Sequence, residues 1–315
     1  MSRPTVVFMG TPDFAVASLA AICDAGYEVK AVVTVPDRQA GRGRKLTPSP
    51  VKEYAVERGL PVLQPEKLRD PEFLERLKSC NADLFVVVAF RMLPQVVWQM
   101  PPMGTFNLHA SLLPDYRGAA PINWAVMNGE KETGVTTFFL NEKIDEGKIL
   151  LQEKTPIYDD DTAGTLHDRL MEIGKHLVVN TIRGLENNSI EPQPQKRLNP
   201  KDAPKIFKDD CRIDWNRSGE EIVNFVRGLS PYPAAFMNLE YPDGGTVSFK
   251  VFDAAFEKED GVQLFYLKTD GKKYLKIGVK DGFIAINEIQ MSGKRKNTIE
   301  DFLRGNNITD CKLVF

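Results

Sequence analysis

The sequence has little cysteine and little histidine, and neither residue type is clustered. Its 315 residues include four cysteines and three histidines, and no two cysteines form a C-x-x-C pair. A disulfide-stapled scaffold and a zinc site are therefore not expected. The same scarcity favours a reduced, cytoplasmic setting and a protein that binds no metal.

Long apolar runs and an excess of one charge are also missing. The longest apolar run, 84–90, has seven residues, which is too short to cross a bilayer. A strand-like run begins as early as Thr5, so no signal peptide is expected. The 41 basic and 43 acidic side chains give a net charge of −2, which excludes a protein that coats nucleic acid through its overall charge. A polyanionic partner would have to be bound by local positive charge.

The sequence does contain enough apolar material for two cores. Hydrophobic residues make up 42% of the chain, and its length suits two domains. In the first half, buried-strand runs alternate with helical apolar spacing. The predicted strands are 5–9, 29–35, 61–64 and 83–90, and the predicted helices are 14–25, 50–58 and 71–80. The alternation predicts an α/β fold with a doubly wound, mostly parallel sheet of Rossmann-like type, covered by helices on both faces.

The pattern changes in the second half. A long helix is predicted to begin at the acidic cluster 159–162, and the stretch 187–204, with four prolines, indicates a linker. Short apolar runs then follow at 246–252, 262–267, 274–279 and 283–289, separated by glycine-containing turns. Such runs are typical of a small antiparallel barrel of the oligonucleotide-binding (OB-like) type. We predict a first domain at 1–190, a linker at 191–207 and an OB-like barrel at 208–315.

Asn107 and His109 are the first candidates for chemistry. If 105–109 is a strand, the two side chains project to the same face, because alternate residues of a strand do so. An amide donor can hold a developing oxyanion, and a protonated imidazole can donate to the same oxygen or to a leaving group. This pairing suits acyl transfer, although an ordinary strand-end asparagine and a core histidine would explain the pair if it stood alone.

Asp145 supplies a carboxylate after the predicted strand 134–140. We expect its turn to return to the same edge of the sheet as His109, where the carboxylate would fix the tautomer of the imidazole and favour its charged form. The other two histidines, His167 and His176, lie in the long helix and are expected to be ordinary surface or packing residues.

Several motifs together resemble the folate-dependent formyltransferases, a family that moves a formyl group from 10-formyltetrahydrofolate to an amine. The shared signature is Asn107-Leu108-His109, Ser111-Leu112-Leu113-Pro114, Tyr116-Arg117-Gly118 and Asp145. Three further segments resemble the branch that formylates methionyl-initiator tRNA, namely 10–15, the basic loop 36–45 and Arg212-Ile213-Asp214-Trp215. The resemblance covers essentially the whole chain.

The resemblance implies roles for several residues of the shared signature. Asn107, His109 and Asp145 would be catalytic: the α-amine attacks the formyl carbon directly, Asn107 and His109 hold the oxyanion, and Asp145 supports the imidazolium. The product would be the N-formylmethionyl-tRNA used in translation initiation. The residues implied to line the site of the folate co-substrate are Ser111, Leu112, Leu113 and Pro114, with Phe90, Arg91, Met92 and Leu93 in the turn after a buried strand.

Two basic segments offset the acidic remainder of the chain. An irregular loop and its flanks at 36–52 carry a net charge of 5 − 1 = +4, and 268–280 carries the same. The resemblance implies that the loop enters the acceptor arm of the tRNA and that the barrel tracks its backbone. The residues implied to contact tRNA are Arg38, Arg42, Arg44, Lys45, Lys205, Lys208, Lys272 and Lys273. A monomer is adequate for this chemistry.

Other functions remain open at the level of sequence. A formyltransferase acting on a small amine, such as an amino sugar or a glycinamide ribonucleotide, would share the signature but would not need the arginine-rich loop. A folate-dependent hydrolase and an RNA-binding protein with a vestigial enzyme domain fit less well. A dinucleotide dehydrogenase is disfavoured because the turn 10–13 lacks the glycine spacing that cradles a pyrophosphate.

Overall fold

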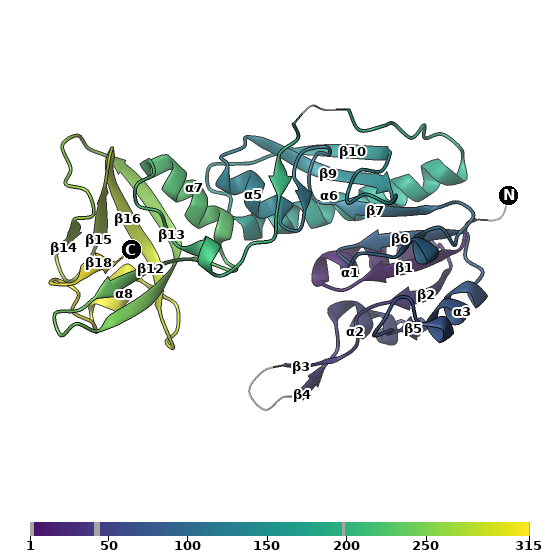
Figure 1. Cartoon of the computed structure of the whole chain (residues 1–315), viewed down its shortest axis with the longest axis horizontal. Helices are drawn as coiled ribbons and strands as arrows, with labels where there is room; N and C mark the ends of the chain where they lie inside the picture. The colour runs from purple at the N-terminus through teal and green to yellow at the C-terminus, as the bar shows by residue number, and fades with distance from the viewer. Residues whose placement is uncertain (1–2, 41–44, 197–198, 315) are drawn as a thin grey trace. The chain divides into compact units, whose positions relative to one another are not determined.

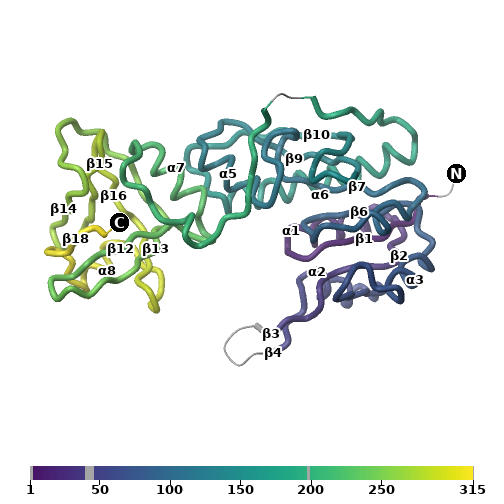
Figure 2. Tube along the Cα trace, viewed as in Figure 1, coloured from purple at the N-terminus to yellow at the C-terminus, as the bar shows by residue number. Residues whose placement is uncertain are grey.

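The chain folds into two compact units in a computed structural model that describes residues 3–40, 45–196 and 199–314 (Figure 1). The first unit takes the described residues within 1–118, 132–156 and 167–202. The second takes those within 119–131, 157–166 and 203–315. Figure 2 follows the same trace along the chain.

The first unit is built on one sheet with the strand order β10-β9-β7-β6-β1-β2-β5. The pairs β7–β6, β6–β1, β1–β2 and β2–β5 are parallel, whereas β9 and β10 are antiparallel. The strands are β1 (Val6–Gly10), β2 (Val29–Val33), β5 (Val62–Leu63), β6 (Leu84–Val88), β7 (Thr105–His109), β9 (Glu132–Phe139) and β10 (Ile149–Pro156). The predicted mostly parallel, doubly wound sheet is confirmed.

Helices cover both faces of this sheet. Val7 and Met9 of β1 pack in one core cluster with Phe73 and Leu77 of α3. On the other face, a Cβ added to Gly174 of α6 would lie 2.8 Å from the side chain of Leu108 in β7, so the helix and the strand are in close contact. The helices of this region are α1 (Asp13–Asp24), α2 (Pro50–Glu57), α3 (Pro71–Ser79), α4 (Gln95–Trp98) and α6 (Ala163–Glu186), the first turn of α6 belonging to the second unit.

The basic segment after β2 is more ordered than the sequence predicted. β3 (Arg38–Ala40) and β4 (Lys45–Thr47) pair antiparallel, so an irregular loop is the wrong description for these residues, while 41–44 lie outside the described residues. Asp37 fixes the base of this hairpin by accepting hydrogen bonds from Lys52 Nζ at 2.6 Å and Gln64 Nε2 at 2.8 Å. The bond from Lys52, followed by that from Gln64, lowers the pKa of Asp37. Lys52 is therefore engaged within the protein.

The second unit contains a nearly closed antiparallel barrel, as predicted, with the strand order β14-β15-β16-β13-β12-β18 and β17 beside β16. Helix α7 (Gly219–Leu229) packs on it and shares its core with Trp215 and Phe249. The remaining elements are β12 (Ala235–Glu240), β13 (Thr246–Lys258), β14 (Leu267–Thr269), β15 (Leu275–Val279), β16 (Gly282–Met291), β17 (Asn297–Thr298), α8 (Ile299–Leu303) and β18 (Lys312–Val314). The predicted strand 262–267 is wrong except for Leu267, because Phe265 has a left-handed backbone with φ 64° that interrupts an extended chain.

Segments from the first half of the chain also belong to the second unit. Helix α5 (Pro121–Met127) packs against α7, and Asn123 Nδ2 donates to the carbonyl of Gly228 at 2.8 Å. The remaining short elements are β8 (Arg117–Gly118), β11 (Asp202–Ala203) and a 3-10 turn, η1 (Asp209–Cys211). The domain limits 1–190, 191–207 and 208–315 stay a prediction. Among the described residues, no helix is long and apolar enough to cross a membrane.

Candidate functional site

Strand β7 presents Asn107 and His109 on the face opposite α6. Leu108, between them, points toward Gly174 of α6, so its two neighbours project to the other face. His109 is buried, with 6% of its surface exposed, and Asn107 is half-buried. Among the described residues, none forms a hydrogen bond with the carboxamide of Asn107. Its N–H groups are free to donate to a ligand.

The two ring nitrogens of His109 differ in their surroundings. Nε2 lies 2.8 Å from the carbonyl oxygen of Tyr116. A carbonyl oxygen only accepts, so Nε2 carries a proton. Nδ1 lies 3.9 Å from Oδ2 of Asp145, which is too long for a hydrogen bond. The expectation that Asp145 fixes the tautomer is wrong: the Tyr116 carbonyl does so.

The loop that carries Asp145 does not leave the sheet where the sequence suggested. β9 runs antiparallel to β7 with Phe139 opposite Phe106, so this loop begins at the amino end of β7. It folds back along the strand until Oδ2 of Asp145 accepts a hydrogen bond from the backbone N–H of Gly118 at 3.0 Å. Asp145 has a φ of 53°, a left-handed conformation that aspartate tolerates better than most residues. His109 and Asp145 thus meet through a reversal of the loop.

The loop that carries Asp145 is held by the side chains of Gln195 and Arg117. The sequence alone assigned neither side chain a role. Gln195 Nε2 donates to the carbonyls of Asp145 at 2.8 Å and Gly147 at 2.9 Å. Its Oε1 accepts from Arg117 Nε at 3.1 Å and Nη2 at 2.6 Å. Arg117 Nη1 in turn lies 3.2 Å from Oε1 of Glu146. Arg117 stands in the Tyr-Arg-Gly motif, but Gln195 lies in a proline-rich stretch where no local pattern singles it out.

The Ser111–Pro114 segment forms a tightly bonded turn after β7. Ser111 Oγ donates to the carbonyl of Asp115 at 2.6 Å, and Thr136 Oγ1 donates to the carbonyl of Ser111 at 2.6 Å. Ser111 and Leu113 are buried, whereas Leu112 and Pro114 are half-buried. Leu112 and Pro114 are thus the more accessible residues of this turn.

The turn after β6 combines an anchored arginine with an exposed methionine. Arg91 Nη1 donates to the carbonyl of Glu66 at 2.8 Å and Nη2 donates to that of Pro65. Burial, followed by the charge of Arg38, lowers the pKa of Arg91. Phe90 is half-buried and Leu93 is buried, but Met92 is 73% exposed. The turn therefore offers an apolar surface on a fixed backbone.

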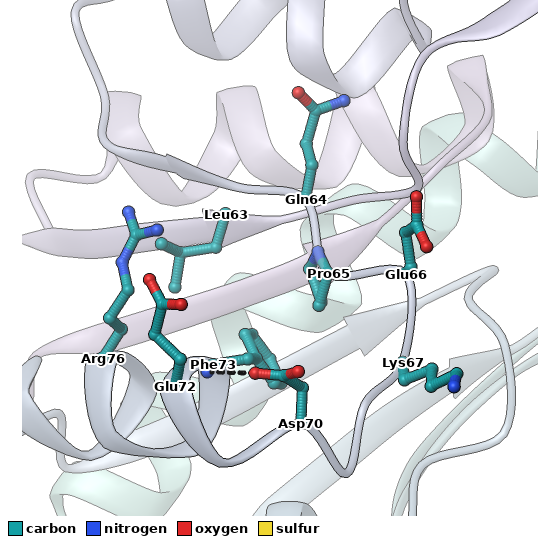
Figure 3. A pocket seen from close by; sticks show the side chains of 9 residues that line it. All are labelled: Leu63, Gln64, Pro65, Glu66, Lys67, Asp70, Glu72, Phe73 and Arg76. Carbon is teal, nitrogen blue, oxygen red and sulfur yellow. Dashed lines mark hydrogen bonds between the residues drawn. The ribbon is translucent and has the colours of Figure 1, made fainter.

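A pocket of about 400 Å³ lies beside the β5–α3 segment (Figure 3). Its wall includes Gln64, Asp70 and Arg76, and Asp70 Oδ1 accepts the backbone N–H of Phe73 at the start of α3. None of the candidate catalytic residues lines this pocket. It is separate from the Asn107, His109 and Asp145 constellation.

The basic residues proposed for tRNA are distributed over both units. Arg38 is exposed in β3, Arg42 and Arg44 lie outside the described residues, and so does the side chain of Lys45. The Lys205 ammonium lies 5.2 Å from the centre of the Phe207 ring, and Lys208 is exposed. Lys272 and Lys273 are exposed between β14 and β15, where both backbone N–H groups donate to Asp270.

The four cysteines lie in surroundings that suppress ionisation of their thiols. Burial raises the pKa of Cys23, Cys80, Cys211 and Cys311, so these thiols stay protonated at neutral pH and are poor nucleophiles. The part of the chain that the structure describes holds no group of three or more His, Cys, Asp or Glu side chains able to bind a metal ion.

Two family models match most of the chain. The model described as formyl transferase matches residues 3–182, and that of the formyl transferase C-terminal domain matches 205–307. The chain therefore belongs to the formyl transferase family.

Relatives named methionyl-tRNA formyltransferase match over nearly the full length. The protein from Parabacteroides distasonis is 54% identical over 311 residues, covering 95% of each chain. That from Bacteroides thetaiotaomicron is 50% identical over 312 residues, covering 97% of this chain and 96% of its own.

Solved structures support the same fold at low sequence identity. A sugar 3N-formyl transferase, crystallised in the presence of dTDP and 5-N-formyl-THF, is 20% identical with a TM-score of 0.66, covering 94% of this chain and 100% of its own. HypX from Aquifex aeolicus in complex with tetrahydrofolic acid is 20% identical with a TM-score of 0.61, covering all of this chain and 51% of its own.

Proposed function

We propose that this protein transfers the formyl group of 10-formyltetrahydrofolate to the α-amine of methionyl-initiator tRNA, giving N-formylmethionyl-tRNA for translation initiation. The observation that carries the proposal is that Asn107 and His109 project to one face of the sheet and that Asp145 lies 3.9 Å from His109. Relatives about half identical over nearly the full chain, named methionyl-tRNA formyltransferase, support this acceptor over a small amine.

Asn107 and His109 are the proposed donors to the reacting group. The folate co-substrate supplies a formyl carbon bonded to N10, which the neutral amine attacks. The uncommitted carboxamide of Asn107 donates to the formyl oxygen as negative charge develops there. Nε2 of His109 is committed to the Tyr116 carbonyl, so Nδ1 is the nitrogen left to donate a proton at the reacting centre.

Asp145 supports this proton transfer without taking part in a covalent bond. As the amine forms its new C–N bond it must lose one proton, and N10 must gain one as the old C–N bond breaks. An imidazolium at His109 can deliver the proton to N10, and the neutral imidazole that remains can take up the proton that the amine loses, which restores the imidazolium. The Asp145 carboxylate lies 3.9 Å away and faces this charge. No acyl-enzyme is required because the amine is itself the nucleophile.

The folate co-substrate is proposed to bind between the two turns that follow β6 and β7. Met92 and Phe90 offer an apolar surface suited to a flat heteroaromatic ring, and Leu112 and Pro114 are the accessible part of the second turn. Both turns lie at the carboxyl ends of parallel strands, where ligands of open α/β sheets bind. Arg91, Leu93, Ser111 and Leu113 would shape the backbone of this site.

The tRNA is proposed to be bound through local positive charge on both units. In the first part of the chain the proposed contacts are Arg38 of β3, Lys45 of β4, and Arg42 and Arg44, which come between them in the sequence. In the second unit they are Lys205, Lys208, Lys272 and Lys273. Single-stranded ends suit this arrangement better than a duplex, because the deep groove of an RNA helix admits side chains poorly. We propose a monomer working in the cytoplasm.

One labelling experiment tests the proposal. The protein is incubated with formyl-labelled 10-formyltetrahydrofolate and, in separate reactions, methionyl-tRNA, a nucleotide-linked amino sugar, or glycinamide ribonucleotide. Label on methionyl-tRNA alone is the expected result. Label on either small amine with none on the tRNA would overturn the assignment of the acceptor.

A further inference from the structure

We propose that Gln195 is a positioning residue that holds Asp145 within reach of His109. This inference rests on the proposed function, because it assumes that Asp145 acts in formyl transfer. Gln195 itself lies outside the signature motifs, in the segment that the sequence indicates to be a linker.

The carboxamide of Gln195 has every hydrogen-bonding position filled. Its two N–H groups donate to the carbonyls of Asp145 and Gly147, and its oxygen accepts twice from Arg117. The partners also determine the orientation of the amide: reversing it would place its oxygen against two carbonyl oxygens and its NH2 group against the guanidinium. The contact is specific for glutamine in this orientation.

These bonds act on three successive residues of the loop that carries Asp145. Asp145 is held through its carbonyl by Gln195 and through its carboxylate by the Gly118 N–H, while Glu146 is paired with Arg117. Gly147 is held through its carbonyl by Gln195. The φ of 53° at Asp145 is one that a non-glycine residue adopts only when its surroundings hold it there.

The segment around Gln195 is itself anchored to the sheet. Gln193 exchanges two backbone hydrogen bonds of 2.8 Å with Ile149 at the start of β10. This anchor places Gln195 beside the loop without any contribution from the side chain of Gln193, which is exposed and, within the described part of the chain, bonds only to the nearby carbonyl of Glu191. Gln193 is therefore a matched control of the same residue type in the same segment.

The test compares Gln195→Ala, Gln195→Glu and Gln193→Ala in the formylation of methionyl-tRNA. Gln195→Glu keeps the length and the acceptors for Arg117 but loses both donors to the loop. Both Gln195 variants should lower kcat by about 10- to 100-fold with little change in either KM, because a small misplacement of a catalytic group costs about this much. Gln193→Ala should match the wild type. Thermal unfolding identifies any variant that fails to fold. If Gln195→Ala fails to fold, the kcat of the isosteric Gln195→Glu tests the inference.

A double-mutant cycle separates positioning from a general structural effect. In an Asp145→Asn background, Gln195→Ala should cost less than about 3-fold, because the group that it positions has already been disabled. Equal losses of kcat in both backgrounds, or a normal kcat for both Gln195 variants, would overturn the inference. Absence of transfer by the wild type would instead overturn the proposed function, so the two failures are distinguishable.

Discussion

Nδ1 of His109 and Oδ2 of Asp145 lie 3.9 Å apart, although the loop carrying Asp145 leaves the sheet at the amino end of β7 and His109 ends that strand. The carboxylate comes close to the imidazole only because the loop reverses its direction and is held by hydrogen bonds from Gly118 and Gln195. Nε2 is already bonded to the carbonyl of Tyr116. Nδ1, the nitrogen that faces Asp145, is therefore the one that the proposed proton transfer would use.

Replacing Asn107 with alanine should lower kcat for formyl transfer by about 100- to 1000-fold, because an oxyanion donor of this kind contributes that much. The carboxamide bonds to none of the described residues, so stability should change little. Steady-state kinetics and thermal unfolding check both expectations. The exposed Asn187 supplies the control, Asn187→Ala; near-normal turnover in Asn107→Ala would remove Asn107 from the catalytic site.

Replacing His109 with alanine should reduce kcat at least as far, about 100- to 1000-fold or more, since both a donor and a proton carrier are lost. The variant also removes the hydrogen bond between Nε2 and the Tyr116 carbonyl, so a modest loss of stability is expected alongside. Turnover should be measured well below the unfolding temperature. The exposed His176 on α6 provides the comparison, and a His109→Ala enzyme as active as His176→Ala would refute the role.

Much of the candidate site could be predicted because it depends on local pattern. The strand 105–109 has the predicted bounds, and its alternation is enough to place Asn107 and His109 on one face. The contact of Tyr116 with His109 could not be predicted, because a backbone carbonyl has no side-chain signature. Gln195 was missed for a different reason: its partners lie far away in the sequence, and proline-rich surroundings gave only the signal of a linker.

In the fold, too, features that depend on local sequence could be predicted, and features that depend on contacts between distant segments could not. The parallel strands and their helices followed from apolar periodicity, which each segment carries by itself. That α5 packs with α7 in the second unit depends on contacts such as Asn123 with Gly228, and no local pattern in 121–127 distinguishes this partner. The apolar run 262–267 suggested a strand, but the left-handed backbone of Phe265 interrupts the extended chain, and β14 begins only at Leu267.

Replacing Arg42 with alanine should raise KM for tRNA and flatten its dependence on salt, with little change in kcat. Each phosphate contact that is lost removes about one released counterion from the binding equilibrium, so the slope of log affinity against log salt should fall by about 1. Measuring KM at several salt concentrations gives this slope. Lys154→Ala, which removes an exposed cation paired with Glu132, is the control. Identical slopes for the wild type and Arg42→Ala would exclude Arg42 from tRNA binding.

Asp83→Asn should destabilise the first unit in a pH-dependent way. Asp83 Oδ2 accepts the backbone N–H of Thr5 at 2.7 Å and its hydroxyl at 2.8 Å, and these bonds, the backbone one first, lower the pKa of Asp83. A lowered pKa means that the stabilisation is fully present above the pKa of the unfolded carboxyl, about 4, and is lost as the pH falls through the folded value. The variant should therefore lose about 1 kcal/mol at neutral pH, and the difference from the wild type should shrink below about pH 4.

Urea unfolding at several pH values measures the effect of Asp83→Asn. The exposed Asp260 supplies a matched change, Asp260→Asn, that is expected to be neutral. A difference in the free energy of unfolding that stays constant from pH 7 to pH 3 would contradict the link to ionisation of Asp83.

Gly147→Ala tests whether the reaction requires the loop that carries Asp145 to lie close against the sheet. A Cβ at this position would lie 1.5 Å from the carbonyl oxygen of Phe139, a backbone atom that ends β9 and cannot turn aside as a flexible side chain would. The loop must then move as a whole, which pulls the carbonyl of Gly147 away from Gln195 and Asp145 away from His109. Overpacking of this kind costs about 1–3 kcal/mol of stability, and kcat should fall by at least as much as in Gln195→Ala. Gly305→Ala, where an added Cβ meets no atom within 4 Å, should leave both quantities unchanged; a Gly147→Ala enzyme with normal kcat would show that catalysis tolerates displacement of the loop.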